Sequence, residues 1–270
     1  MTKNTYRPKY PVHSLEKALG LVECLKSCPG EGLQINELSE RLNLGKSTVH
    51  RILDTLLAHQ YVEKCQHSKY RLGWKLFEIG NAIPRQRNLD LFDPLILQNL
   101  CNKYDETVNL AVCIGDRAVI VAKCDPLNVS VKANLLVGGR EPLHATAIGK
   151  SLISELNFKE LHAIFDGEHL KRYTQKTITS IAELFEHLQT VREVGYSIDE
   201  EEYSEGLTCI AVPIKNHRKD IIAAISISGP TFRLKHKKIL DAIQDLQSAR
   251  DDMSKYFGLY QSTMCIPSGS

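Results

Sequence analysis

The segment QINELSERLNLGKSTVHRILDTLLAHQ, residues 34 to 60, decides the fold of the first part of the chain. It carries two apolar stripes at helical spacing, with a break at residues 43 to 45. We therefore predict two short amphipathic helices joined by a tight turn. The apolar positions are Ile35, Leu38 and Leu42 in the first helix and Val49, Ile52, Leu53 and Leu56 in the second.

The second predicted helix has a polar face opposite its apolar stripe, with Arg51 at its centre. Hydrogen-bond donors along one face of a helix suit the base edges in the major groove of DNA. An ordinary helical hairpin with a solvated polar face would show the same pattern. The residues that we expect to contact bases are Lys46, Ser47, Thr48, His50 and Arg51.

Residues 61 to 73, YVEKCQHSKYRLG, follow directly and predict a β-hairpin with its turn at residues 66 to 68. After three predicted helices, this hairpin completes the element order of a winged helix-turn-helix. A basic hairpin alone is usually a solvated edge, but behind a DNA-reading helix it is well placed to contact phosphates. The residues that we expect to make these contacts are Lys64, Lys69 and Arg71.

The composition predicts two domains in a soluble protein, because 270 residues exceed one small domain and 24% charged residues are ordinary. Residues 1 to 90 carry 14 Lys and Arg against 9 Asp and Glu, whereas the remainder carries 20 against 23. A basic first third favours a nucleic-acid-binding module. We find neither a signal peptide nor an apolar run that could span a bilayer, so we expect a cytoplasmic protein without a membrane partner.

The eight cysteines form no CxxC pair, and the chain has no P-loop, GxSxG or HExxH motif. We therefore expect no metal, no cofactor and no catalytic residues. An enzyme with Cys209 as nucleophile and His144 as base is the rival hypothesis, although nothing in the spacing demands it.

The order of motifs predicts an α+β fold whose second domain has an antiparallel sheet covered by helices. Ser14 is the expected N-cap of a first helix, and Pro84 is expected to end the linker helix. The residues that the first helix is expected to bury are Leu15, Ala18, Leu19, Val22 and Leu25. We also predict a strand at NVSVKAN, residues 128 to 134. The predicted ranges are a flexible basic tail (1–12), a winged helix-turn-helix domain (13–73), a linker helix (74–90), the second domain (91–258) and a flexible tail (259–270).

Three polar clusters of the second domain lie at the ends of predicted elements. PLHATAIGK, residues 142 to 150, starts a helix whose free N–H groups could bind a carboxylate. GYSIDEEEYSEGLTCIAVPI, residues 195 to 214, places an aspartate and a cysteine near the ends of two strands. The SISGP segment places two serines on one face of a strand. Each cluster alone is more often structural than functional.

Residues 14 to about 258 resemble the IclR-type bacterial transcriptional regulators. The resemblance is carried by LGKSTVHRILDTL and KYRLG, followed by PLHATAIGK, GYSIDEEEYSEGLTCIAVPI and AAISISGP in that order. It implies an N-terminal winged helix and a GAF-like C-terminal domain that binds an effector. Within the family, YRLGWKLFEIGN, TAIGK and TITSIAEL are similar to the KdgR-like members, repressors of pectin catabolism with a keto-deoxy sugar acid as ligand.

The resemblance also implies which residues hold a small carboxylate effector. They are Ala147, Ile148, Asp199, Cys209, Ser226 and Ser228.

The sequence therefore predicts a repressor of carbohydrate or organic-acid catabolism genes, controlled by a small sugar acid or keto acid. An aromatic acid is the alternative effector, and a constitutive DNA-binding protein without an effector is a further alternative. The expected partners are double-stranded operator DNA and further copies of the chain, in a homodimer or a tetramer. Trp74, Phe77 and Ile83 on the linker helix are the expected dimer contact, although packing onto their own domain would explain them equally well.

Overall fold

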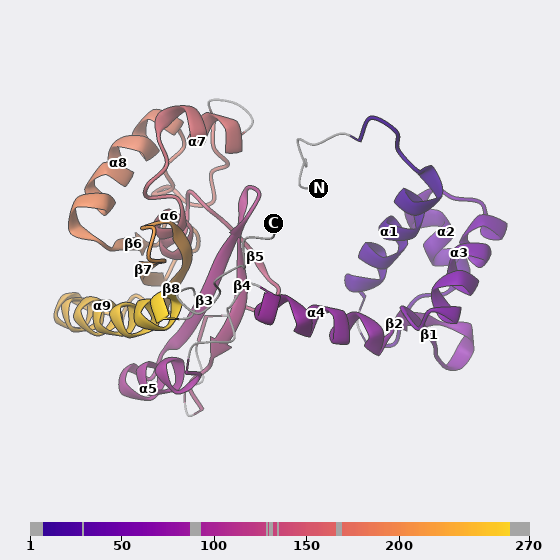
Figure 1. Ribbon diagram of the computed structural model, residues 1–270, viewed down its shortest axis with the longest axis horizontal. Helices are drawn as coiled ribbons and strands as arrows, with labels where there is room; N and C mark the ends of the chain where they lie inside the picture. The colour runs from indigo at the N-terminus through magenta and orange to yellow at the C-terminus, as the bar shows by residue number, and fades with distance from the viewer. Residues whose placement is uncertain are drawn as a thin grey trace, which may run out of the picture. The chain divides into compact units, whose positions relative to one another are not determined.

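The computed structural model describes residues 8–28, 30–86, 93–127, 129, 132–133, 135–165 and 169–259. The chain divides near residue 90 into two compact units (Figure 1). The predicted tails fall largely outside the described residues. None of the helices in the described part of the chain is long and apolar enough to cross a membrane.

The first unit consists of helices followed by a short hairpin, as predicted. Its elements are α1 (His13–Lys26), α2 (Ile35–Leu42), α3 (Lys46–Ala58), β1 (Val62–Lys64), a turn at Gln66–Ser68, β2 (Tyr70–Leu72) and α4 (Trp74–Gln86).

The three-helix part of this unit packs around one small apolar core. Leu38 of α2 and Val49 of α3 are fully buried, and Leu53 lies beside them, so the predicted apolar stripes are confirmed. Between the two helices Asn43 adopts a left-handed conformation (φ 50°), which turns the chain sharply after α2. The hairpin joins the same core through Val62.

The buried face of α1 differs from the prediction. Val12 caps the helix instead of Ser14, and Leu15 and Leu19 are both more than half exposed. Leu25 is buried as predicted, and Leu21, which was not predicted to be buried, is fully buried. Packing against α2 and α3 therefore covers the side of the helix that carries Leu21 and Leu25 and leaves Leu15 and Leu19 exposed.

The predicted end of the linker helix at Pro84 is also wrong, because α4 continues to Gln86. A proline inside a helix removes one hydrogen bond, and here that loss does not end the helix. Trp74 and Phe77 are 71% and 61% exposed, and Ile83 is 50% exposed. The apolar side of α4 is therefore not covered by its own unit.

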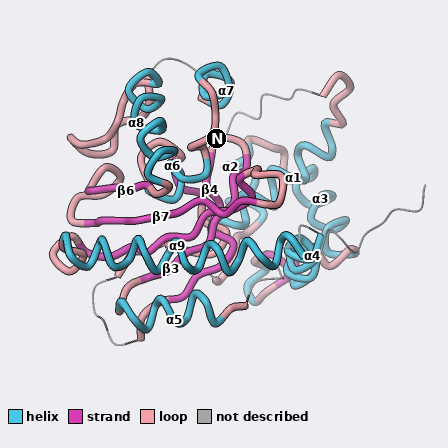
Figure 2. The backbone as a smooth tube through the Cα atoms, turned by 60° about the vertical axis from the view of Figure 1, so that its left-hand side comes forward, coloured by secondary structure: helices cyan, strands magenta, loops and turns pink. Residues whose placement is uncertain are grey.

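The second unit is a six-stranded antiparallel sheet in the order β5-β4-β3-β8-β7-β6, with helices on both faces. Figure 2 shows α5 and α9 on one face and α6, α7 and α8 on the other. The elements are α5 (Leu95–Tyr104), β3 (Thr107–Ile114), β4 (Arg117–Cys124), β5 (Arg140–Pro142), α6 (Ala147–Leu152), α7 (Phe158–Ile164), α8 (Ile181–Val194), β6 (Ser197–Glu200), β7 (Leu207–Lys215), β8 (Ile221–Pro230) and α9 (His236–Leu259).

The central strands β7 and β8 are buried on both faces, which explains their almost continuous apolar sequences. Cys209 and Ala211 pack in one cluster with residues of α6 and α8, so the alternating residues Ile210 and Val212 lie on the opposite face. The face that carries Cys209 is called the α6 face below.

Two further predictions for this unit need correction. Four of the seven residues of the predicted strand NVSVKAN lie outside the described residues, and the described ones, Val129, Lys132 and Ala133, form no strand. The helix predicted from Thr146 to Leu156 is shorter and ends at Leu152.

Candidate functional site

The polar face of α3 is accessible, as a DNA-reading surface requires. Lys46, Ser47, His50 and Arg51 are exposed, and Thr48 is partly buried at the edge of the core. The helix is held from behind by its buried Val49 and Leu53, so its outer face does not contribute to the core. This arrangement is that of a helix anchored by its back and free to enter a groove.

The basic residues of the hairpin are less available than the sequence suggested. The ammonium group of Lys69 lies 2.7 Å from a carboxylate oxygen of Glu31, and its side chain is only 27% exposed. Arg71 pairs with Glu63 at 3.1 Å. Lys64 is exposed, and no ion pair involves it within the described part of the chain. Lys64 is therefore the hairpin cation that a phosphate reaches most easily.

In the second unit, strand pairing brings distant polar residues into one row on the α6 face. Asp199 of β6 lies opposite Cys209 of β7, and Cys209 lies opposite Ser228 of β8. Directly opposed residues in an antiparallel sheet project to the same face. Ser226, two residues before Ser228, lies opposite Asn109 of β3 and belongs to the same face. The four sheet residues predicted from the sequence are thus brought together.

The two remaining predicted residues, Ala147 and Ile148, begin α6, which packs on this face. Thr146 caps the helix, since its hydroxyl accepts the N–H of Gly149 at 3.1 Å. Gly149 allows the close packing: a Cβ there would lie 2.6 Å from the Cα of Leu143. Any other residue would push the start of α6 away from the preceding strand.

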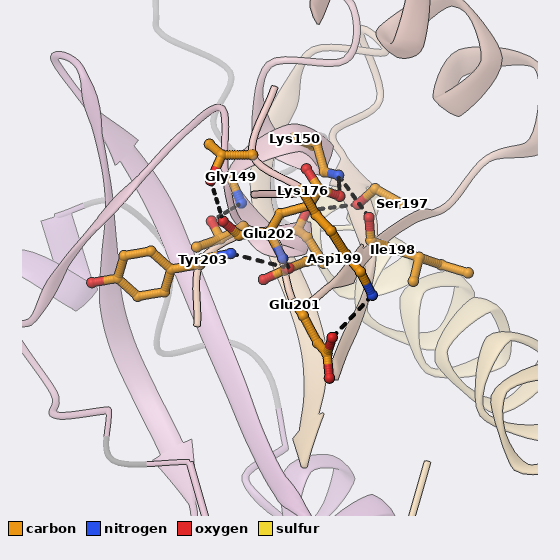
Figure 3. A network of polar contacts seen from close by, with 12 residues as sticks. Gly149, Lys150, Lys176, Ser197, Ile198, Asp199, Glu201, Glu202 and Tyr203 are labelled. Carbon is orange, nitrogen blue, oxygen red and sulfur yellow. Dashed lines mark hydrogen bonds and ion pairs between the residues drawn. The ribbon is translucent and has the colours of Figure 1, made fainter. Parts of the chain in front are cut away.

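A buried polar network ties α6 to β6 and to the loop after it (Figure 3). Lys150 is fully buried; its ammonium group donates to the carbonyl of Ile198 at 2.7 Å and pairs with the carboxylate of Glu202. Ser197 donates from its hydroxyl to the carbonyl of Ala147 at 2.6 Å. Neither Lys150 nor Glu202 was predicted from the sequence as a site residue. A lysine inside a helix that begins with apolar residues was the available signal.

Asp199 is held by the same loop. Its Oδ1 accepts the backbone N–H of Glu202 at 2.7 Å and that of Tyr203 at 3.4 Å, whereas its Oδ2 has no hydrogen-bond partner among the described residues. Burial raises the pKa of Asp199 to about 7, and the backbone hydrogen bonds oppose that change. At neutral pH this carboxyl group therefore exists in both protonation states and can either accept or donate a hydrogen bond.

The surroundings of Cys209 and His144 do not support a catalytic pair. Cys209 is buried, and burial raises the pKa of its thiol far above the ordinary value, so the reactive thiolate is disfavoured. The Nε2 of His144 hydrogen-bonds to the carbonyl of Lys171 at 2.9 Å, and its ring packs against Phe165 and Tyr173. No group of three metal-binding side chains is found in the described ranges.

Comparison with known proteins agrees with the resemblance seen in the sequence. The family "IclR helix-turn-helix domain" matches residues 14–65, and "Bacterial transcriptional regulator IclR C-terminal" matches residues 87–255. These two matches cover most of the chain and confirm the combination of a helix-turn-helix domain with an α/β domain built on an antiparallel sheet.

Individual relatives and one solved structure extend the match over nearly the whole chain. KdgR of Escherichia coli (strain K12), an HTH-type transcriptional regulator, is 35% identical over 252 residues, which are 92% of this chain and 94% of that protein. XynR of the same organism, also an HTH-type transcriptional regulator, is 34% identical over 248 residues, 92% and 98% of the two chains. The crystal structure of Thermotoga maritima IclR has a TM-score of 0.75 at 28% identity and covers 91% and 99%.

The raised pKa of Asp199 predicts a pH-dependent cost to folding. A carboxyl group whose pKa rises from 3.8 to about 7 on folding favours the native state fully below pH 3.8 and loses that contribution as the pH rises through 7. Asp199→Asn keeps the Oδ1 acceptor and removes the titration. We expect the free energy of unfolding of the variant, relative to that of the natural protein, to increase by about 3 kcal/mol between pH 5 and pH 8, at 1.36 kcal/mol per pKa unit.

Urea unfolding of both proteins at pH 5 and pH 8 measures this difference. Asp241→Asn, at an exposed position of α9, is the matched control and should show no such pH dependence. A stability difference between Asp199→Asn and the natural protein that stays constant over this range would show that Asp199 does not titrate there.

Proposed function

The chain belongs to the IclR family of bacterial transcriptional regulators. We propose that it is a repressor whose affinity for operator DNA is controlled by a small carboxylate. Its relatives are regulators and not enzymes, in keeping with the protonated, buried thiol of Cys209. One of them, the transcriptional repressor IclR of Escherichia coli (strain K12), is 30% identical over 92% of this chain. Binding to chromosomal DNA would place the protein in the cytoplasm.

The exposed face of α3 carries the DNA-binding part of the proposal. Arg51 at its centre could donate two hydrogen bonds to one guanine, the commonest specific contact in the major groove. Ser47 and His50 flank it on the same face. Lys64 and, more weakly, the paired Lys69 and Arg71 would contact phosphates, which adds affinity without adding sequence preference.

The polar α6 face carries the effector part of the proposal. The carboxylate would lie at the start of α6, near the N–H groups of Ala147 and Ile148, with the hydroxyls of Ser226 and Ser228 beside it. Asp199 would accept a hydroxyl of the ligand or, when protonated, donate to it. A sugar acid or keto acid of carbohydrate or organic-acid catabolism suits these groups better than an aromatic acid, since the face is lined with hydroxyl and carboxyl groups.

Control of DNA binding requires that the effector bind two states of the protein with different affinity. A ligand that lies between α6 and strands β6, β7 and β8 would alter the distance between α6 and β6, the two elements that Lys150 joins. The proposal is therefore a shift between a DNA-binding and a DNA-releasing population. The alternative is a constitutive DNA-binding protein without an effector. That alternative does not explain why a row of polar side chains is buried on the α6 face.

We also propose that the chain acts as a dimer or as a pair of dimers. The exposed apolar residues of α4, which include Trp74 and Phe77, form one uncovered surface, and Leu15 and Leu19 of α1 form another. Large exposed apolar surfaces commonly mark protein contacts. A single winged helix also buries too little DNA for the affinity that an operator site needs.

The effector prediction is tested on the full-length protein with an operator selected from random DNA. We expect one or more sugar acids or keto acids to raise the melting temperature and to release the operator, because a ligand that prefers the native state must stabilise it. Ser226→Ala should weaken both effects by about tenfold in ligand concentration, the cost of roughly one hydrogen bond. Unchanged ligand affinity in Ser226→Ala and in Asp199→Asn would place the effector site elsewhere.

The two kinds of DNA contact should respond differently to substitution. Arg51→Ala is expected to weaken operator binding about 10- to 100-fold and to flatten the preference for the operator over random DNA. Lys64→Ala should weaken binding to operator and random DNA alike and reduce the slope of log affinity against log salt by about one. Titrations at several salt concentrations measure both. An Arg51→Ala variant with undiminished sequence preference would refute the assignment of the α3 face.

The dimer prediction is tested by light scattering at micromolar concentration. We expect the natural protein to have at least twice the mass of one chain and to bind a pseudo-palindrome with half-sites spaced by about one helical turn, roughly 34–36 Å, or a multiple of it. Phe77→Glu should lower the association state, because it places a charge on the apolar surface of α4. Asn81→Ala, on the same helix, is the control. A monomer that binds its operator tightly would contradict the proposal.

A further inference from the structure

Four acceptor oxygens in the second unit are buried without a hydrogen-bond partner among the described residues: Asn109 Oδ1, Glu141 Oε2, Asp199 Oδ2 and Glu202 Oε2. The last belongs to the carboxylate that already pairs with Lys150. Asn109 and Asp199 are fully buried, and Glu141 is 9% exposed. Buried polar atoms are nearly always paired in folded proteins, so each unpaired acceptor calls for an explanation.

The other three side chains, those of Asn109, Glu141 and Asp199, belong to the α6 face. Asp199 lies opposite Cys209, and Asn109 lies opposite Ser226. The amide nitrogen of Asn109 donates to the hydroxyl of Ser228 at 3.4 Å. Glu141 of β5 lies opposite Ala118 of β4, whose side chain packs in the same cluster as Cys209.

Electrostatics independently indicates that Glu141 lies close to the predicted effector residues. The charges of Asp199 and Glu141 both raise the pKa of the Cys209 thiol, after the larger effect of burial. Tyr203, on the loop that also caps Asp199, lowers the pKa of the Glu141 carboxyl against the larger effect of burial, so the two side chains are neighbours. The Oε2 of Glu141 has no hydrogen-bond partner among the described residues. Glu141 was not predicted from the sequence because it precedes the motif that begins at Pro142.

The chemistry of these atoms selects among the possible ligands. Each unpaired oxygen can accept a hydrogen bond, and a carboxylate or amide oxygen is satisfied only by a donor. A simple keto acid such as pyruvate offers no hydroxyl donor, and a hydroxylated aromatic acid offers a single one. A polyhydroxylated acid of five or six carbons offers several donors along a chain, together with a carboxylate that can lie apart from Glu141.

We propose that Glu141 is a specificity-determining residue of the effector site, where it acts with Asn109 and Asp199 to accept hydroxyl groups of a polyhydroxylated monocarboxylic acid. The inference rests on the proposed function and narrows its ligand class. It excludes aromatic acids and short keto acids as the preferred effector. A site built to hydrogen-bond a hydroxyl discriminates strongly against analogues that lack it, because the buried acceptors would then stay unpaired.

The test is isothermal titration calorimetry of the full-length protein with three probes: D-gluconate, pyruvate and 4-hydroxybenzoate. We expect D-gluconate to bind at least about tenfold more tightly than either of the others. Glu141→Gln preserves the shape of the side chain but removes its charge and one of its acceptors. It should weaken the binding of D-gluconate about tenfold and change the dissociation constant of pyruvate by no more than about twofold. The selectivity ratio, which is the dissociation constant of pyruvate divided by that of D-gluconate, should therefore decrease.

Two further variants keep the result interpretable. Glu200→Gln removes a carboxylate from an exposed position of β6 next to Asp199 and should leave the selectivity ratio unchanged. Asn109→Ala should narrow the ratio as Glu141→Gln does, with the melting temperature of each variant showing that it is folded. If Glu200→Gln lowered the selectivity ratio as much as Glu141→Gln, the effect would come from the net charge near the site, and the specific role of Glu141 would be refuted.

The possible failures are distinguishable. If none of the three acids binds and none of a wider set of small carboxylates does, the proposed function itself fails. If pyruvate or 4-hydroxybenzoate binds as tightly as D-gluconate, or if Glu141→Gln leaves the ratio unchanged, the role of Glu141 is refuted while a carboxylate effector remains in place.

Discussion

The buried ammonium group of Lys150 is the contact on which the geometry of the second unit depends. It joins α6 to β6 through the carbonyl of Ile198 and to the following loop through Glu202. Removing one member of a buried ion pair leaves an uncompensated charge, which is far more costly than the pair itself is stabilising. The start of α6 and the loop that holds Asp199 are therefore coupled, and a ligand lying between them acts on both.

The sheet beneath this contact serves two purposes on its two faces. One face of β7 and β8 is apolar, with residues such as Ile210 and Ile227 fully buried. The α6 face instead carries Asp199, Ser226 and Ser228 in a place where apolar residues would stabilise the fold more. Polar groups that are buried and incompletely paired reduce stability, and functional sites are where proteins tolerate that loss.

Much of this could be predicted from the sequence, because local patterns specify local structure. The stripes of α2 and α3 and the strands at Asp199, Cys209 and Ser226 follow from periodicity and motif order. The buried face of α1 was predicted correctly at Leu25 but not at Leu15 and Leu19, because packing against other helices decides which apolar residues are covered. Asn109, Glu141 and Lys150 escaped notice because strand register and helix placement, which the sequence does not display, bring them to the site.

The central claim is that the polar row on the α6 face exists to bind a ligand and not to hold the fold together. Its most direct test is the melting temperature of Ser226→Ala without any added ligand, because Ser228 accepts a hydrogen bond from Asn109 and its removal would leave a buried donor unpaired. We predict a melting temperature equal to or above that of the natural protein, together with weaker stabilisation by an added acid such as D-gluconate. A lower melting temperature with ligand stabilisation intact would show that the row is structural.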